Sequence, residues 1–149
     1  MPAGEYIDEA HCHSRRSGPD RGRSAAGRRA GDAPTLTLTP GETVTVRIAS
    51  DPAGFILVSR ERGEAAGERP ADAIRFIFTG GRQTMLQVEN GYPQSFNYRA
   101  RLTVGSRAAS TSTCTVLPRI MVLESWPHPI DRLELSAPRL SDDAEMACR

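Results

Sequence analysis

The stretch Thr35-Leu-Thr-Leu-Thr-Pro-Gly-Glu-Thr-Val-Thr-Val-Arg-Ile48 alternates apolar and polar side chains on both sides of a Pro-Gly pair. Successive side chains of a β-strand point to opposite faces, so this period of two predicts strands with one buried face and does not fit a helical stripe. Pro40-Gly41 supplies a turn, and Thr and Val suit a pleated, half-buried surface. We therefore expect a β-hairpin over 35–48, which opens the folded part of the chain.

Similar patterns continue toward the end of the chain. Gly80-Gly81 is a hairpin signal between two alternating runs, and 54–60 is a short apolar run typical of a buried strand. Three proline residues, Pro118, Pro127 and Pro129, place the last strands at sheet edges or end them in irregular loops. Strands are predicted over 54–60, 73–79, 83–89, 95–104, 112–117, 120–125 and 130–135.

These segments predict an all-β fold. Short strands separated by regular turn signals are typical of an antiparallel β-sandwich, so we expect an immunoglobulin-like sandwich of about seven to nine strands. An open or closed barrel is the alternative. The chain has 149 residues, which is enough for a single domain, and we place that domain at 34–149.

Residues 1–33 have a different composition. The segment 10–31 holds six Arg and one acidic residue, Asp20, among Ser, Gly, Ala and Pro, and it shows no strand or helix period. Such a segment buries too little apolar surface to offset the entropy of ordering it, so we predict a disordered Arg-rich arm. Nucleic-acid contact through this arm is an alternative function. We favour a solvated extension, because no aromatic residue lies among the arginines to stack on bases.

Charge and hydropathy limit the location and the partners. The net charge is +1, so no global field attracts nucleic acid or anionic lipid. No apolar stretch has the length of a membrane-spanning helix or of the centre of an export signal. Taken literally, the chain is expected in the cytoplasm. A misassigned start would instead hide an export signal and favour a periplasmic or secreted domain. All 19 basic residues are Arg, a bias that we attribute to a GC-rich bacterial genome.

Two cysteines give the clearest chemical expectation. Cys114 lies in a predicted strand and Cys148 lies in the polar segment Glu145-Met-Ala-Cys-Arg, where a lone Cys has no packing role. We favour a disulfide between them, which would hold the last residues against the domain. The alternative is two free thiols in a reducing cytosol. Cys12 would remain unpaired in either case.

The candidate catalytic and metal-binding residues do not form a recognisable site. His11-Cys12-His13 has no second ligand cluster at the spacing that structural zinc needs. His128 has Ser125 and Asp131 nearby in sequence, but no nucleophile motif accompanies them. We therefore expect no enzymatic activity, no metal site and no cofactor.

Four residues are candidates for contact with a partner. Arg99 and Arg101 are predicted on the polar face of the strand over 95–104, with Arg75 beside them. Such a basic stripe suits an acidic partner or glycan, and a solvated sheet face is the alternative. Trp126 is the sole Trp. We favour core packing at a strand end for Trp126 over stacking on a ligand.

Several motifs resemble small, uncharacterised exported proteins of Gram-negative bacteria: Asn90-Gly-Tyr-Pro, Phe96-Asn-Tyr-Arg-Ala-Arg, Cys114-Thr-Val-Leu-Pro, Glu124-Ser-Trp-Pro and Ile130-Asp-Arg-Leu-Glu-Leu. The resemblance covers about 35–148 and has no assigned activity to transfer. It implies an oxidising compartment and a Cys114–Cys148 bridge.

The expected function is a non-enzymatic structural or protein-interaction module of the bacterial envelope, whose protein partner and oligomeric state are open. A carbohydrate-binding or enzyme-accessory domain is the alternative. It requires aromatic residues exposed together on one face, and Tyr92, Tyr98 and Trp126 are the ones available in the folded part.

Overall fold

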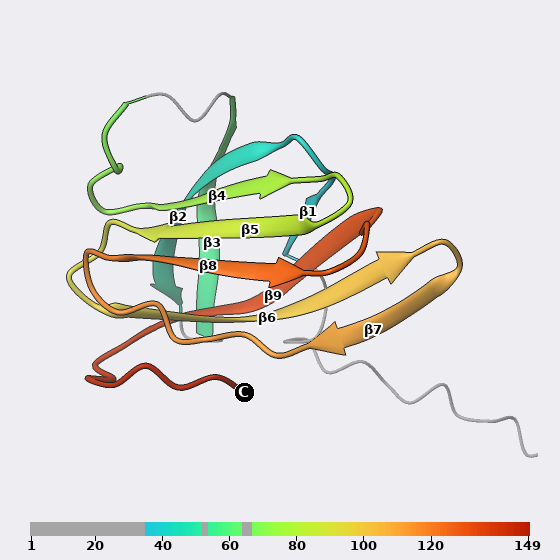
Figure 1. Ribbon diagram of the computed structural model, residues 1–149. Helices are drawn as coiled ribbons and strands as arrows, with labels where there is room; N and C mark the ends of the chain where they lie inside the picture. The colour runs from blue at the N-terminus through green and yellow to red at the C-terminus, as the bar shows by residue number, and fades with distance from the viewer. Residues whose placement is uncertain (1–34, 52–53, 64–66) are drawn as a thin grey trace, which may run out of the picture.

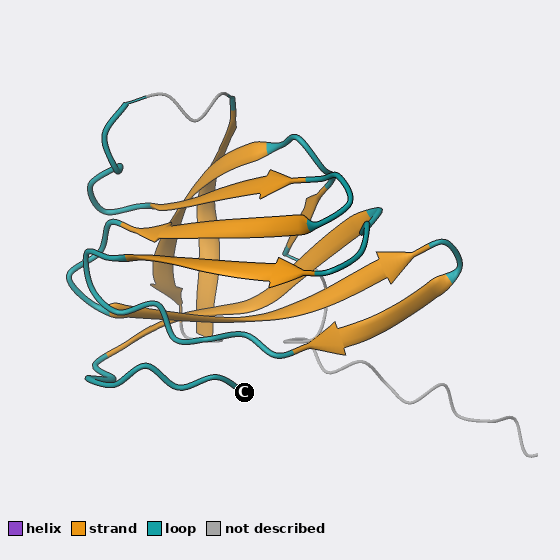
Figure 2. Ribbon diagram, in the orientation of Figure 1, coloured by secondary structure: helices purple, strands orange, loops and turns teal. Residues whose placement is uncertain are grey.

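The computed structural model describes residues 35–51, 54–63 and 67–149. Over these residues the chain forms nine strands and no helix (Figures 1 and 2). The strands are β1 (Leu36–Leu38), β2 (Thr43–Asp51), β3 (Gly54–Arg62), β4 (Ile74–Thr79), β5 (Thr84–Asn90), β6 (Ser95–Val104), β7 (Arg107–Thr111), β8 (Met121–Trp126) and β9 (Arg132–Ser141). No helix in this part of the chain has the length and apolar character to cross a membrane. The arm predicted over 1–33, with Cys12 and the His11-Cys12-His13 cluster, lies outside the described residues.

The strands form two antiparallel sheets that face each other. One sheet has the order β1-β9-β6-β7 and the other has the order β3-β2-β4-β5-β8. The core lies between them, where the inward-facing side chains of both sheets meet. Its largest fully buried apolar side chains are Phe78, Phe96, Leu38, Ile74, Leu86, Ile130 and Leu133. The prediction of an all-β, two-sheet antiparallel fold is therefore confirmed.

The predicted hairpin over 35–48 is wrong. β1 pairs with β9, whereas β2 pairs with β3 and β4, so the two segments belong to different sheets. The Pro40-Gly41 link crosses between the sheets: Gly41 has a φ of 92°, and its N–H donates to the carbonyl of Phe78 at 2.7 Å. Alternation of apolar residues shows only that each segment buries one face. Two segments bury one face each whether they pair in one sheet or lie in two sheets that face each other, so the alternation does not predict a hairpin.

The hairpin at Gly80-Gly81 is confirmed, since β4 and β5 pair along their length. Ile74 lies opposite Asn90 at one end, and Thr79 lies opposite Met85 next to the turn. The predicted buried strand over 54–60 is wrong in one respect. It forms β3, which lies at the edge of its sheet, with Ile56 and Val58 45% and 53% exposed. A short apolar run by itself does not distinguish a central strand from an edge strand.

The strand predicted over 112–117 is also wrong. That segment makes only two isolated bridges, Phe96–Val116 and Cys114–Cys148. The regular strand lies just before it, in β7, which pairs with β6 across the two-residue loop Gly105-Ser106. Small and exposed residues make up most of β7, so no apolar alternation marks it in the sequence. The strands predicted over 120–125 and 130–135 are present as β8 and β9, and β9 lies inside its sheet rather than at an edge.

Asn90 fixes the segment that follows β7. Its fully buried side chain donates from Nδ2 to the carbonyls of Gln94, Val116 and Leu117 at 2.8–3.1 Å. Its Oδ1 accepts the N–H of Tyr92 at 2.9 Å. One side chain therefore joins the β5–β6 turn to the segment between β7 and β8, and this segment forms one wall of the site described next.

Candidate interaction surface beside strand β7

The structure separates the three arginines predicted to form a stripe. Arg99 and Arg101 lie on β6, whereas Arg75 lies on β4 in the opposite sheet, so the expectation that Arg75 lies beside them is wrong. Arg75 is buried and ion-paired with Glu89 at 2.5 Å, and its guanidinium also donates to the carbonyls of Gly67 and Glu68 at 3.3 Å. Arg75 therefore anchors the loop before β4 against the sheet.

Trp126 ends β8 and is buried, as core packing requires. Its Nε1 donates to Oγ1 of Thr111 at 3.2 Å. Tyr92 and Tyr98 are buried as well. The three aromatic residues that a carbohydrate-binding face would need are thus packed inside the domain, and this arrangement does not support sugar stacking through them.

Cys114 and Cys148 have their sulfur atoms at disulfide distance, 1.93 Å, so the predicted pair is present in the structure. The backbone explains the pairing. Thr113 exchanges two hydrogen bonds with Arg149, each 2.9 Å, and the N–H of Thr115 donates to the carbonyl of Ala147 at 2.8 Å. Cys114 and Cys148 therefore occupy a non-hydrogen-bonded antiparallel position, where opposing side chains lie closest.

An open groove of about 810 Å³ lies over β6. Ala137 and Arg139 of β9 line one side, and the segments 110–114 and 147–149 line the other. Three arginines, Arg99, Arg139 and Arg149, line it, and no carboxylate side chain is among its lining residues. Arg139 forms an ion pair with Asp143 at 3.9 Å, just outside the lining. The charged side chains that line the groove are therefore guanidinium groups.

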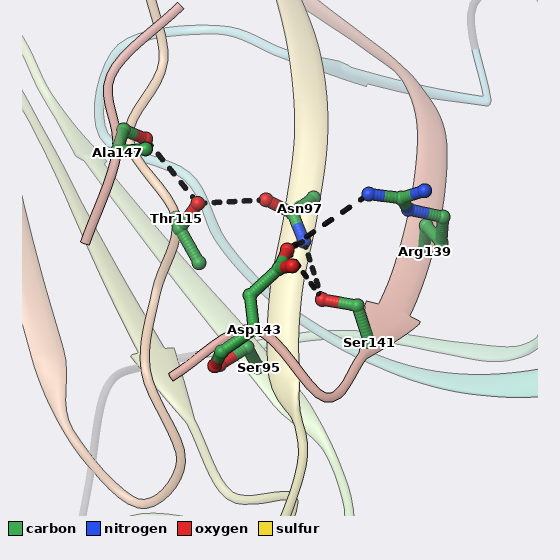
Figure 3. Close-up of polar contacts among 7 residues, drawn as sticks. All are labelled: Ser95, Asn97, Thr115, Arg139, Ser141, Asp143 and Ala147. Atoms are coloured by element: carbon green, nitrogen blue, oxygen red, sulfur yellow. Dashed lines mark hydrogen bonds and ion pairs between the residues drawn. The ribbon is translucent and has the colours of Figure 1, made fainter. Parts of the chain in front are cut away.

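A polar cluster holds the groove's C-terminal wall in place (Figure 3). Asn97 donates to Oγ of Ser141 at 2.9 Å and to Oδ2 of Asp143 at 3.1 Å, and the hydroxyl of Thr115 donates to Oδ1 of Asn97 at 2.9 Å. The hydroxyl of Ser95 donates to the backbone carbonyl of Asp143 at 2.6 Å. Side chains of β6 therefore contact both the end of β9 with the residues after it and the segment that follows β7.

This cluster favours an ionised Asp143. The hydroxyl of Ser141 and the amide of Asn97 both donate to Oδ2 of Asp143 and lower the pKa of that carboxyl below its ordinary value of 3.8. The charges of Arg139 and Arg149 act in the same direction. Asp143 is therefore a charged acceptor at neutral pH, and it orders the residues that follow β9.

Glu124 of β8 connects this strand to Cys114, which lines the groove. Its Oε1 accepts the hydroxyl of Tyr98 at 2.7 Å and the N–H of Cys114 at 3.3 Å, while Oε2 is buried and has no hydrogen-bond partner among the residues that the structure describes. Burial raises the pKa of Glu124 above its ordinary value of 4.5, and the two donors partly oppose that shift. Burial of the Tyr98 hydroxyl, together with the charge of Glu124 and the hydrogen bond to it, raises the pKa of Tyr98.

Among the described strands, β7 is the edge strand next to the groove. The two-residue loop makes Val104 and Arg107 the closing, hydrogen-bonded pair of the β6–β7 hairpin, and Gly105 has a φ of 57° at the first loop position. Antiparallel pairs alternate in type, so the N–H and C=O of Ala108 and Ser110 point away from β6. Their side chains are small and exposed. β7 therefore offers an accessible row of backbone donors and acceptors.

The residues weighed for catalysis have structural contacts. Oδ2 of Asp131 accepts the N–H of Gly105 at 2.6 Å and so holds the β6–β7 turn, while the backbone carbonyl of His128 accepts the hydroxyl of Thr84 at 3.0 Å. Over the described ranges, no three His, Cys, Asp or Glu residues are grouped so that they could hold a metal ion.

Sequence reasoning found Arg99, Arg101 and the two cysteines but missed Ser110, Arg139 and Arg149. The alternation over 95–104 revealed which arginines share the outer face of β6. No local pattern connects Arg139 or Arg149 to that face, because β9 and the C-terminal segment reach it through long-range pairing.

Comparisons of the chain with protein-family models, with curated proteins and with solved structures found no match.

Proposed function

We propose that this protein is a non-enzymatic interaction module of the bacterial envelope, which binds a protein partner at the β7 edge. The observation that carries the proposal is the outer edge of β7, which no other described strand pairs with, beside a groove lined by three arginines. An open strand edge is a template for pairing with another chain. The polar cluster and the Cys114–Cys148 pair hold the groove wall in a fixed position, which reduces the entropy lost on binding.

The location in the envelope is supported by the cysteine pair. Disulfides persist in the periplasm and outside the cell and are rare in the cytosol. The motifs that resemble exported proteins of Gram-negative bacteria favour the same compartment. Alkylation of thiols in intact cells, followed by mass analysis, tests this part: Cys114 and Cys148 should be protected until a reductant is added. Rapid alkylation of both without reductant would contradict it.

Within the two-sheet class, we propose an immunoglobulin-like arrangement. Support comes from β1 and β2, which are consecutive but lie in opposite sheets, and from the pairing of β1 with the last strand, β9. A barrel is less well supported, because no backbone ladder joins one named sheet to the other over the described residues.

Site-specific photo-crosslinking in cells tests the interaction directly. A photoreactive amino acid at Ser110, on β7, should give a discrete adduct with one envelope protein. The matched control is Arg82, an exposed residue in the β4–β5 loop in the opposite sheet. A discrete adduct at 110 and none at 82 supports the proposal. Equal labelling at both positions, or no adduct at 110, argues against it.

A further inference from the structure

Of the two arginines on the outer face of β6, Arg101 lies one strand in from the edge of β7, and Arg99 lies just past the end of the β6–β7 ladder. Arg99 and Arg101 are two positions apart on β6, so their side chains leave the same face about 7 Å apart. Ser110 lies opposite Arg101 on β7, and Ala108 is the next outer-face residue along β7. Only small side chains therefore separate the guanidinium group of Arg101 from the edge of β7.

A strand added to β7 would bring its own side chains within reach of the arginines. It would lie about 5 Å beyond β7 and so about 10 Å from β6. An Arg side chain and a Glu side chain that extend toward each other over Ser110 span that distance. Because alternate residues of a strand share a face, the matching ligand carries carboxylates at every second position.

The chain itself uses this edge next to β7. Residues 147–149 make backbone hydrogen bonds to Thr113 and Thr115, just beyond the last residue of β7, around the isolated antiparallel bridge between Cys114 and Cys148. Figure 1 shows the C-terminal segment running along that side of the molecule and ending before β7. A partner strand on β7 would continue the line of this segment, with Arg149 at the junction.

We propose that the β7 edge, with Arg101, Arg99 and Arg149 beside it, binds an extended segment of a partner protein as an additional strand carrying acidic residues at alternate positions. This rests on the proposed function and names the chemistry of its partner. Backbone hydrogen bonds to Ala108 and Ser110 provide the affinity, and the arginines provide the specificity.

Two observations favour a peptide over an acidic glycan. A glycan has no backbone N–H and C=O groups in the register of a strand, so it would not use the outward-facing groups of Ala108 and Ser110. Glu134 also lies on this outer face, opposite Arg101 and ion-paired with Arg132 at 3.4 Å. A polyanion following only charge would meet that carboxylate, whereas a strand on β7 approaches from the other side of β6.

The test is a binding titration with the full oxidised chain. The probe is a labelled ten-residue peptide of alternating Thr and Glu, and the control peptide has Gln in place of Glu. We expect the Glu peptide to bind at least about tenfold more tightly, with an affinity that falls as salt is added. Equal affinity for the two peptides, or no binding of the Glu peptide, overturns the assignment.

Two matched variants locate the site. Ser110→Glu puts a carboxylate where the ligand's would lie and should weaken binding of the Glu peptide by at least about tenfold. Ser106→Glu makes the same charge change in the exposed hairpin loop and should leave the affinity within about twofold. An equal loss in both variants would show general charge repulsion and would overturn the assignment.

Amide hydrogen exchange separates strand addition from charge binding without a backbone variant. Saturating peptide should slow the exchange of the Ala108 and Ser110 amides, whose N–H groups face outward, and should leave that of Ala109 nearly unchanged. Heparin, as a sulfated glycan, should produce no such pattern. Protection of neither amide by the peptide, or the same protection with heparin, overturns the proposal. Crosslinks from position 110 that persist in cells despite this result would leave the proposed interaction function standing.

Discussion

The two sides of the sandwich, one formed by the edge strands β1 and β3 and the other by β7 and β8, are held by different kinds of contact. On the side of β1 and β3, Arg60 and Arg62 extend from β3 and donate to the backbone carbonyls of Thr35 and Thr37, so side chains cover the edge. On the side of β7 and β8, a disulfide and a buried hydrogen bond hold the segment after β7, and no other described strand pairs with the outer edge of β7. Exposed side-chain contacts contribute the stability of the first side. A disulfide and buried hydrogen bonds contribute most of the stability of the second side, and these contacts leave the outer backbone of β7 accessible.

The largest expected effect comes from the cysteines. The double variant Cys114→Ser/Cys148→Ser opens a loop with a sequence separation of 34. The chain-entropy model gives a loss of up to about 3.8 kcal/mol in the free energy of unfolding for such a loop. Urea denaturation of both proteins without reductant measures the difference. Reduced wild type should match the double variant, and equal stability of all three samples would contradict a bond that holds this side.

Asn90→Ala should be the next most damaging change. It removes a buried donor from three carbonyl groups and leaves the N–H of Tyr92 without its acceptor. The carbonyls of Val116 and Leu117 still accept the N–H groups of Phe96 and Ile120, so the variant leaves two groups without a partner, the Gln94 carbonyl and the Tyr92 N–H. Each polar group left buried and unpaired costs about 1–3 kcal/mol, so we expect a loss of at least about 2 kcal/mol. Urea unfolding provides the value. Gln94→Ala serves as the control, because Gln94 contributes only its backbone carbonyl and has an exposed side chain. It should be nearly neutral.

Glu124 makes the stability of the β7–β8 side depend on pH. Its pKa is raised in the folded protein, chiefly by burial, so the folded state holds the proton more tightly than the unfolded state. The resulting contribution to stability is present below pH 4.5 and is lost as the pH rises through the raised pKa. Glu124→Gln keeps an acceptor for Tyr98 and Cys114 but does not ionise.

We therefore expect wild type to lose stability relative to Glu124→Gln as the pH rises from 4.5 toward neutrality. Urea unfolding at a series of pH values measures the difference between the two proteins. A difference that does not change with pH would show that Glu124 has the same pKa in both states. A difference of the opposite sign would mean that its charge is stabilised by the fold.

The smallest effect is expected on the side of β1 and β3. Arg62→Gln removes the hydrogen bond to the carbonyl of Thr37 and the ion pair with Glu42, and the Arg62 side chain is 46% exposed. Exposed pairs contribute about 0–1 kcal/mol, so the loss should remain below about 1 kcal/mol. A loss as large as that of Asn90→Ala would contradict the contrast between the two sides.

Particular residues show what could be predicted. The apolar alternation correctly assigned Leu36, Leu38, Val44 and Val46 to the core, since their burial depends on a local period. It did not identify which strands pair, because the same faces are buried whether two segments share a sheet or face each other. β7 escaped prediction because Arg107-Ala-Ala-Ser-Thr buries little and leaves no pattern.

The candidate site could also be predicted only in part, and the predictable part is the one that depends on local side-chain period. The sequence by itself determined the all-β class, the inward faces, the pairing preference of Cys114 and Cys148, and the shared outer face of Arg99 and Arg101. Only the tertiary structure decided that Arg75 lies in the opposite sheet, that Arg139 and Arg149 reach the groove, and that β7 is the edge of its sheet among the described strands. The reason is physical. Side-chain period is a property of the local backbone, whereas edges and grooves arise where segments distant in sequence meet or fail to meet.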